Sequence, residues 1–334
     1  MTILNYWVEE TDRVWIKVPS IPENDSITIN VKKTGDYSPS GDDTFEFFDD
    51  FSGSSLDTDK WEITHDSGAS TGSVSVGSGL LSLYGAGVKS KNLTFGYGFS
   101  IKSKMRETAN SGTNTASRYG HVQVGFNRVH GTERDDDTFG IYVNPDHTVR
   151  RRIVGITGKD GTFETEESVE DAEHNVWYKL EAARFSASLV KTWWYDEDED
   201  YTFTTNIPTI NLPATLSCRN GTSVQHTGGG DYDWVFVRKI VDDEPSISVT
   251  DQTTHYEVTI NNTGGDELTD YQISVDASDL GTLANDESLK IEEDDFVSGA
   301  TVKIKLNGTI VEKPLMIKTG GVVTQASAIT VKTT

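Results

Sequence analysis

The chain has 334 residues and a formal net charge of −24, from 53 acidic and 29 basic side chains. Such an acidic balance argues against nucleic acid as a partner, because phosphate binding requires a positive surface. The single cysteine, Cys218, excludes an intrachain disulfide. No apolar run approaches the roughly 20 residues that a membrane-crossing helix needs, so we expect no membrane insertion.

Apolar and polar residues alternate with a period of two along almost the whole chain, which predicts strands. The clearest runs are at 13–18, 25–33, 121–127, 138–143, 255–262, 271–275 and 301–308. Turns rich in Gly, Asn and Asp separate these runs, and helical periodicity is nearly absent. The sequence therefore predicts an all-β protein.

Two segments bound the largest predicted domain, residues 44–241. The first, 45–61, reads FEFFDDFSGSSLDTDKW, and the second, 230–239, reads GDYDWVFVRK. Each joins an aromatic run to acidic residues, as expected of strands with one buried face. Together they resemble the opening and closing strands of a concanavalin A-like (laminin G-like) jelly roll. Glu244-Pro245 then interrupts the pattern, and we expect a second, smaller Ig-like β-sandwich over 246–334.

The flanks carry a second resemblance. NYWVEETDRVWIKVPSIPENDSITI, within residues 1–43, resembles the latter half of a β-sandwich domain of unknown function that occurs in archaeal cell-surface proteins. HYEVTINNTGGDELTDYQISVDAS, in the tail, resembles its first half. Three arrangements follow: the N-terminal strands complete the C-terminal sandwich of the same chain, they complete that of a neighbouring chain, or the tail closes alone. We favour the first.

The jelly roll also resembles family-16 glycoside hydrolases, which implies carboxylates in a Glu-x-Asp-x-x-Glu pattern on one strand. The strands at 121–127 and 138–143 have no carboxylate at their polar positions. Glu133, Asp135 and Asp137 have a similar spacing but no apolar residues between them, so they indicate a solvated turn. We therefore predict that the chain is not an enzyme, with a family-16-like glycoside hydrolase as an alternative.

A glycan-binding face is the main functional prediction for the jelly roll. Sugar sites combine aromatic rings with planar polar side chains. The predicted glycan-binding residues are Tyr119, His121, Gln123, Asn127, Tyr142, Arg150 and Trp193. Trp193 and Trp194 point to opposite faces of a strand, so one of them belongs to the core. The alternative for each aromatic residue is that it simply fills the sandwich.

The resemblance also implies a structural calcium ion where the first and last strands of the jelly roll meet. The matching oxygen ligands are Asp49, Asp50 and Asp233. The alternative is that these acids cap turns or pair with Arg238.

These features together predict a non-catalytic surface or virion protein of spike, turret or tail-fibre type. Its jelly roll would bind a glycan or a host-surface protein, and the chain would form a homo-oligomer or part of a larger assembly. The resemblance to archaeal envelope domains, with no signal peptide visible after Met1, favours the surface of an archaeal virion or a cell. The alternative is a purely structural subunit of a virion or surface filament.

Overall fold

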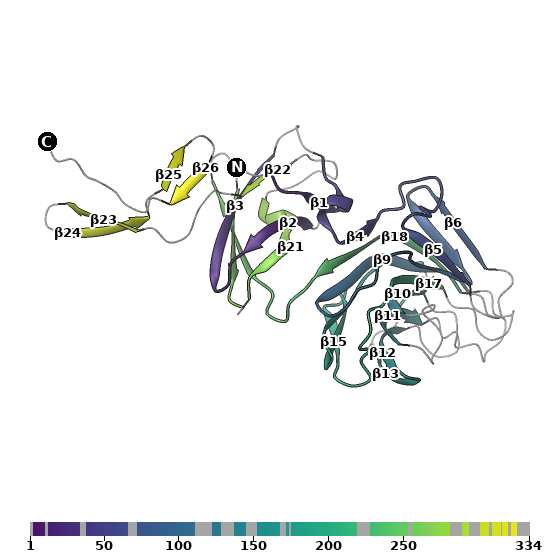
Figure 1. Ribbon diagram of the computed structural model, residues 1–334. Helices are drawn as coiled ribbons and strands as arrows, with labels where there is room; N and C mark the ends of the chain where they lie inside the picture. The colour runs from purple at the N-terminus through teal and green to yellow at the C-terminus, as the bar shows by residue number, and fades with distance from the viewer. Residues whose placement is uncertain are drawn as a thin grey trace. The chain divides into compact units, whose positions relative to one another are not determined.

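The computed structural model describes the chain with interruptions. The described residues are 3–10, 13–33, 38–65, 72–110, 122–127, 137–144, 152–167, 172–173, 175–218, 228–252, 256–264, 266–280, 289–293, 301–306, 309–314, 316–319 and 322–325. They divide into two compact units (Figure 1). One comprises residues 45–242, and the other comprises residues 1–44 together with 243–334.

Residues 45–242 form two packed antiparallel sheets. In spatial order, the seven-stranded sheet contains β13 (Thr162–Glu167), β12 (Arg152–Lys159), β11 (Thr138–Asn144), β10 (Val122–Asn127), β17 (Ala214–Cys218), β8 (Ala86–Ser90) and β5 (Trp61–His65). The eight-stranded sheet contains β16 (Glu199–Phe203), β15 (Leu189–Trp194), β14 (Tyr178–Ser186), β9 (Phe99–Asn110), β18 (Gly228–Lys239), β7 (Leu80–Tyr84) and β6 (Ser73–Gly77), with β4 (Phe47–Asp49) paired to β18.

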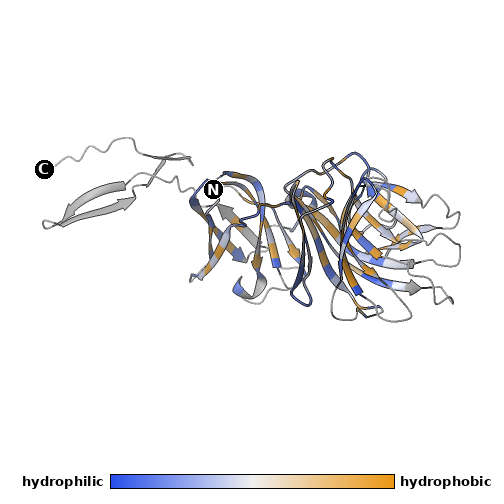
Figure 2. Cartoon of the chain, turned by 90° about the horizontal axis from the view of Figure 1, so that it is seen from below, coloured by the Kyte–Doolittle hydropathy of each residue, from blue (hydrophilic) through white to orange (hydrophobic). Residues whose placement is uncertain are grey.

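The core of the jelly roll lies between these two sheets. Because side chains alternate along a strand, each strand sends every second residue into the core. Val122, Val124 and Phe126 enter from β10, while Leu180 and Ala182 enter from β14, all fully buried. Hydrophobic and hydrophilic residues alternate along many strands of the chain (Figure 2). The prediction of an all-β chain containing a jelly roll is confirmed.

The second unit is built from both ends of the chain. Its three-stranded sheet contains β1 (Tyr6–Glu9), β2 (Arg13–Ile21) and β21 (Leu268–Asp276). Its four-stranded sheet contains β19 (Ser246–Asp251), β20 (Tyr256–Asn262), β3 (Asp25–Lys33) and β22 (Leu289–Glu293). The pairs β2–β21 and β3–β20 each join residues more than 200 positions apart. The jelly roll is therefore an insertion between two halves of this unit.

The remaining elements are short. Two hairpins lie near the C-terminus, β23 (Thr301–Leu306) with β24 (Thr309–Pro314) and β25 (Met316–Thr319) with β26 (Val322–Gln325). Among the residues that the structure describes, the helical segments are α1 (Gly41–Thr44) and the 3₁₀ turn η1 (Ala277–Leu280). Among the described residues, no helix has the length and apolar character that crossing a membrane requires.

Candidate functional site

The candidate site is the face of the seven-stranded sheet that points away from the core. On β10 the core residues are Val122, Val124 and Phe126. Gln123 and Asn127 consequently project to the opposite side. The alternation in VQVGFN thus places polar side chains on the side of the sheet away from the core.

Strand pairing extends this surface across neighbouring strands. Gln123 lies opposite Tyr142 of β11 and Ser217 of β17, and Asn127 lies opposite Thr138. The Asn127 side-chain amide donates a hydrogen bond of 3.1 Å to the Thr138 hydroxyl. We call the following set the polar face: Gln123, Asn127, Thr138, Tyr142, Thr215 and Ser217.

Two glycines lie opposite one another in the middle of the polar face, Gly125 and Gly140. A Cβ atom at Gly125 would lie 2.7 Å from the Cα atom of Gly140. A Cβ atom at Gly140 would lie 2.7 Å from the Val124 carbonyl oxygen and 2.9 Å from Nε2 of Gln123. The side-chain amide of Gln123 therefore lies directly over a position where no larger residue fits.

The polar face is buried although it does not belong to the core. Gln123 is 3% exposed, Asn127 is 1% exposed and Tyr142 is 8% exposed. Amide and hydroxyl groups of this kind both donate and accept hydrogen bonds. Chemically the face suits a ligand that carries many hydroxyl groups. None of the described residues of β10, β11, β12 and β17 on this face is a carboxylate.

The structure brings only part of the predicted glycan site together. Gln123, Asn127 and Tyr142 share the polar face, whereas Tyr119, His121 and Arg150 lie outside the described residues.

Trp193 lies in β15 of the other sheet, with Val190, Thr192 and Trp194 buried on the core side of that strand. Trp193 thus points away from the core on the far side of the sandwich. Its separation from the polar face corrects the prediction of one continuous site.

Of the three acidic residues considered as a catalytic set, the structure describes only Asp137. Glu133 and Asp135 lie outside the described residues, and Asp137 immediately precedes β11 at 8% exposure. The charge of Asp137 acts on the buried guanidinium of Arg184, whose pKa is lowered by burial and raised in part by Tyr97 and Asp137. Asp137 is thus an electrostatic partner of Arg184.

The three acids predicted to hold calcium have protein partners. Asp49 accepts hydrogen bonds from the Phe51 amide and the Trp61 indole, at 2.8 and 2.7 Å. Burial raises the pKa of Asp49, against the effect of these hydrogen bonds.

Asp50 accepts a hydrogen bond from the Ser52 amide, and Asp233 pairs with Lys104 at 2.9 Å. No three His, Cys, Asp or Glu side chains of the described residues gather as a metal site. The calcium site stays a prediction.

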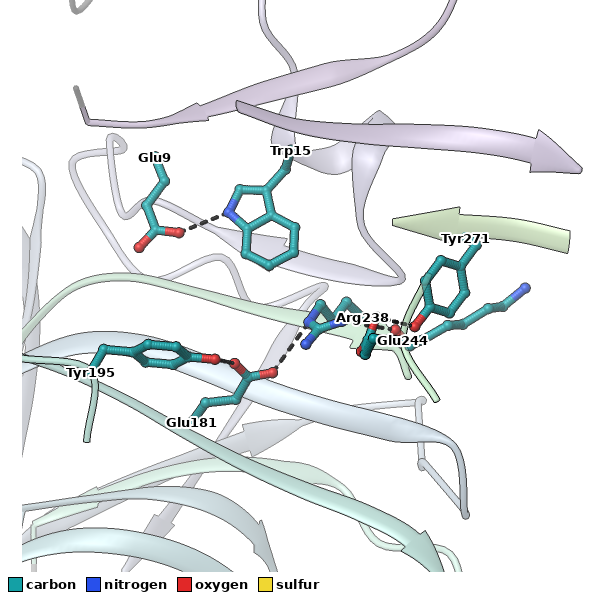
Figure 3. Close-up of polar contacts among 8 residues, drawn as sticks. Glu9, Trp15, Glu181, Tyr195, Arg238, Glu244 and Tyr271 are labelled. Carbon is teal, nitrogen blue, oxygen red and sulfur yellow. Dashed lines mark hydrogen bonds and ion pairs between the residues drawn. The ribbon is translucent and has the colours of Figure 1, made fainter. Parts of the chain in front are cut away.

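One polar cluster is not predicted by the sequence. On the outer face of the eight-stranded sheet, the fully buried Glu181 accepts hydrogen bonds from the Tyr195 hydroxyl (2.5 Å) and from Nε of Arg238 (3.2 Å) (Figure 3). Burial alone would raise the pKa of Glu181, but Arg238 and Lys102 lower it overall. Basic residues at every second position, Lys102, Lys104 and Arg106, indicate from the sequence that one face of β9 is charged. The sequence does not show that β9 pairs with β14 and β18, and this pairing brings the cluster together.

Comparison with known families and structures gives partial matches. A family model described as a domain of unknown function, DUF2341, matches residues 1–64. No curated protein matches the chain.

Among solved structures, the chain is similar to a prokaryotic β-1,3-1,4-glucanase (lichenase) from a mouse hindgut metagenome, with 15% identity and a TM-score of 0.42 over 58% of this chain and 99% of that chain. The Bacillus licheniformis β-glucanase has 17% identity and a TM-score of 0.42, over 57% of this chain and 95% of that chain. The Emp47p carbohydrate recognition domain has 11% identity and a TM-score of 0.41, over 63% of this chain and 98% of that chain.

These matches correct one prediction. The prediction that the chain is not an enzyme, which rests on the missing Glu-x-Asp-x-x-Glu pattern, is withdrawn, because glycoside hydrolases are among these similar structures. Identities of 11–17% show a shared fold and assign no reaction to this chain. The structures similar to the jelly roll include glycanases and a carbohydrate recognition domain.

Proposed function

We propose that the jelly roll of residues 45–242 recognises a glycan chain on its polar face. The observation that carries this proposal is the row of buried amide and hydroxyl side chains over the Gly125–Gly140 pair, on the side of the sheet away from the core. Amide and hydroxyl side chains both donate and accept hydrogen bonds. A ligand rich in hydroxyl groups supplies both donors and acceptors to such a face.

Isothermal titration with oligosaccharides tests the proposal. The probes are gluco-, xylo- and manno-oligosaccharides of equal length, titrated into the full chain. Gln123→Met keeps the length of the side chain and removes its amide, so it should weaken binding at least about tenfold, the loss expected when a partner hydrogen bond is left unmade. Tyr142→Phe removes only a hydroxyl and should weaken binding less.

A matched control separates binding from folding. Thr157 is buried on β12 but donates a hydrogen bond to the Asn206 carbonyl oxygen, on the core side of the sheet. Thr157→Val should change the unfolding midpoint without changing affinity for the oligosaccharide. Unchanged affinity in Gln123→Met would refute the assignment of the polar face.

Glycoside hydrolysis is the second candidate, favoured by the glycanases among the similar structures. A retaining reaction needs two carboxyl groups about 5–5.5 Å apart, and the described part of the polar face offers none. The acids of such an enzyme would have to come from residues outside that part of the chain. Release of reducing ends from β-1,3-1,4-glucan, measured beside the titration, decides between binding alone and cleavage.

The setting of this activity is also a proposal. We infer a role on a virion or cell surface, supported by the match of residues 1–64 to DUF2341 and by the resemblance of the flanks to domains of surface proteins. Immunogold labelling of intact cells and virions tests it. Label confined to the cell interior would contradict it.

A further inference from the structure

The outer face of the eight-stranded sheet carries aromatic side chains as well as charges. Trp177 and Phe185 flank the outward positions of β14, and Trp193 and Tyr195 lie on or just after β15. All four are half-buried. We call these four residues the aromatic strip. The rings lie at the margin of this face, whose central residues Glu181 and Lys102 are buried, and grouped aromatic rings that stay partly exposed are typical of a binding surface.

Contacts along the strip fix the positions of its rings. Trp193 and Phe185 meet edge to face, with ring centroids 6.3 Å apart and planes at 73°. Lys191 also lies over the Phe185 ring, with its Nζ 5.4 Å from the centroid. Trp177 and Tyr195 instead stack on cations: Arg106 lies 4.5 Å from the Trp177 ring, and Lys102 lies 4.2 Å from the Tyr195 ring.

The length of the strip suits an extended ligand. Trp177 and Phe185 are eight residues apart along β14, which corresponds to about 26 Å of strand. Trp193 and Tyr195 lie beside this line, because Trp193 pairs with Glu181 and the Tyr195 amide donates to the Lys179 carbonyl oxygen. Several sugar rings in a row could contact the strip.

Charges beside the strip are balanced. Lys104 pairs with Asp233 at 2.9 Å, and Arg106 pairs with Asp231 at 2.7 Å. Further along the sheet, Lys191 pairs with Asp242 at 3.6 Å, and Arg238 pairs with Glu181 at 3.2 Å. An anionic ligand would have to compete with Asp231, Asp233 and Asp242, whereas an uncharged ligand can accept and donate hydrogen bonds at the rims of these three partly exposed pairs.

We propose that the aromatic strip is a second glycan-binding surface, specific for an uncharged oligosaccharide, on the opposite sheet from the polar face. Flat rings stack on the apolar faces of sugar rings, and the neutralised ion pairs beside them bond hydroxyl groups. The inference is independent of the polar face. The chain then holds two separate sites for sugar chains.

The stoichiometry of binding tests the proposal. Titration of the full chain with a β-1,3-1,4-linked gluco-oligosaccharide should give two sites. The double variant Trp177→Ala/Trp193→Ala should weaken binding at the aromatic strip at least about tenfold, as loss of buried tryptophan contacts does at interfaces. It should leave binding at the polar face intact. Gln123→Met should weaken binding only at the polar face. Trp193→Phe keeps a flat ring and should retain most of the affinity.

The control is Tyr97→Ala, which removes an aromatic ring that is 40% exposed and lies outside the strip. It should leave both sites intact, and a cooperative urea unfolding transition for each variant should show that all variants fold.

Four results would overturn the inference. One is a single site that disappears in Gln123→Met and is unchanged in the tryptophan double variant, in which case the proposed function would still stand. The second is binding of an oligogalacturonate in place of the uncharged probe. The third is loss of self-association in the double variant, seen by sedimentation, with no change in sugar affinity. The fourth is the absence of binding to gluco-, xylo- and manno-oligosaccharides alike, which would count against both sites.

Discussion

Arg238→Met tests the buried charge cluster on the outer face of the eight-stranded sheet. The substitution leaves Glu181, which is 0% exposed, without its guanidinium partner at 3.2 Å. Removing one partner of a buried ion pair costs about 3–5 kcal/mol, because the other charge stays buried. Lys102 still acts on Glu181, so we expect the lower end, about 3 kcal/mol. With an m-value of about 2 kcal/mol/M, the urea midpoint should fall by about 1.5 M.

The matched variants are Glu181→Gln and the double variant Glu181→Gln/Arg238→Met. If the cost comes from an uncompensated charge, the double variant should be more stable than Arg238→Met alone. Urea unfolding at pH 7, followed by tryptophan fluorescence and circular dichroism, measures all four proteins. A loss below about 1 kcal/mol for Arg238→Met, or a double variant no more stable than that single variant, would refute the reasoning.

The same cluster predicts an acid dependence. Because the folded-state pKa of Glu181 is below its ordinary value of 4.5, its contribution is fully present above that value. It is lost as the pH falls through the lower folded pKa. Glu181→Gln should therefore reduce the loss of stability on acidification below about pH 4.5. An acid unfolding profile identical to that of the wild type would show that Glu181 does not titrate as described.

Three further perturbations test other parts of the structure. Deleting residues 1–40 removes β2 and β3, which pair with β21 and β20. Amides at 256–276 should therefore lose hydrogen-exchange protection, while amides of the jelly roll keep theirs. Retained protection at 256–276 would contradict the strand pairing. Chelation by EGTA should leave the melting temperature within about 1 °C, since Asp49, Asp50 and Asp233 have protein partners; a drop of several degrees, reversed by calcium, would restore the calcium site. Burial raises the pKa of the Cys218 thiol far above its ordinary value. A thiol reagent such as DTNB at pH 8 should therefore react only after urea unfolding. Rapid reaction of the native chain would show that β17 is more open than described.

The sequence indicates the fold class because the evidence for it is local. Alternation in VQVGFN and TFGIYV is sufficient to show which side chains share a face of each strand, and it predicts that Gln123 and Asn127 project to the same side of β10. The glycine pair at Gly125 and Gly140 becomes meaningful only when the register between β10 and β11 is known.

The parts of the site that could not be predicted depend on contacts between distant residues. The predicted glycan face includes Trp193 because this residue is aromatic and close in sequence to other predicted strands. Its sheet is determined by the pairing of β15 with β14, and of β14 with β9, whose paired residues are 73 to 85 positions earlier. Glu181 and Arg238 likewise meet across 57 positions. No periodicity in one strand contains this information.

The position of a bound oligosaccharide in a crystal structure of the full chain tests the central claim most directly. Soaking with a β-1,3-1,4-linked gluco-oligosaccharide should give density over Gly125 and Gly140, with sugar hydroxyl groups within hydrogen-bonding distance of the side chains of Gln123 and Asn127. Density confined to other surfaces of the jelly roll, with the polar face empty at saturating ligand, would contradict the account.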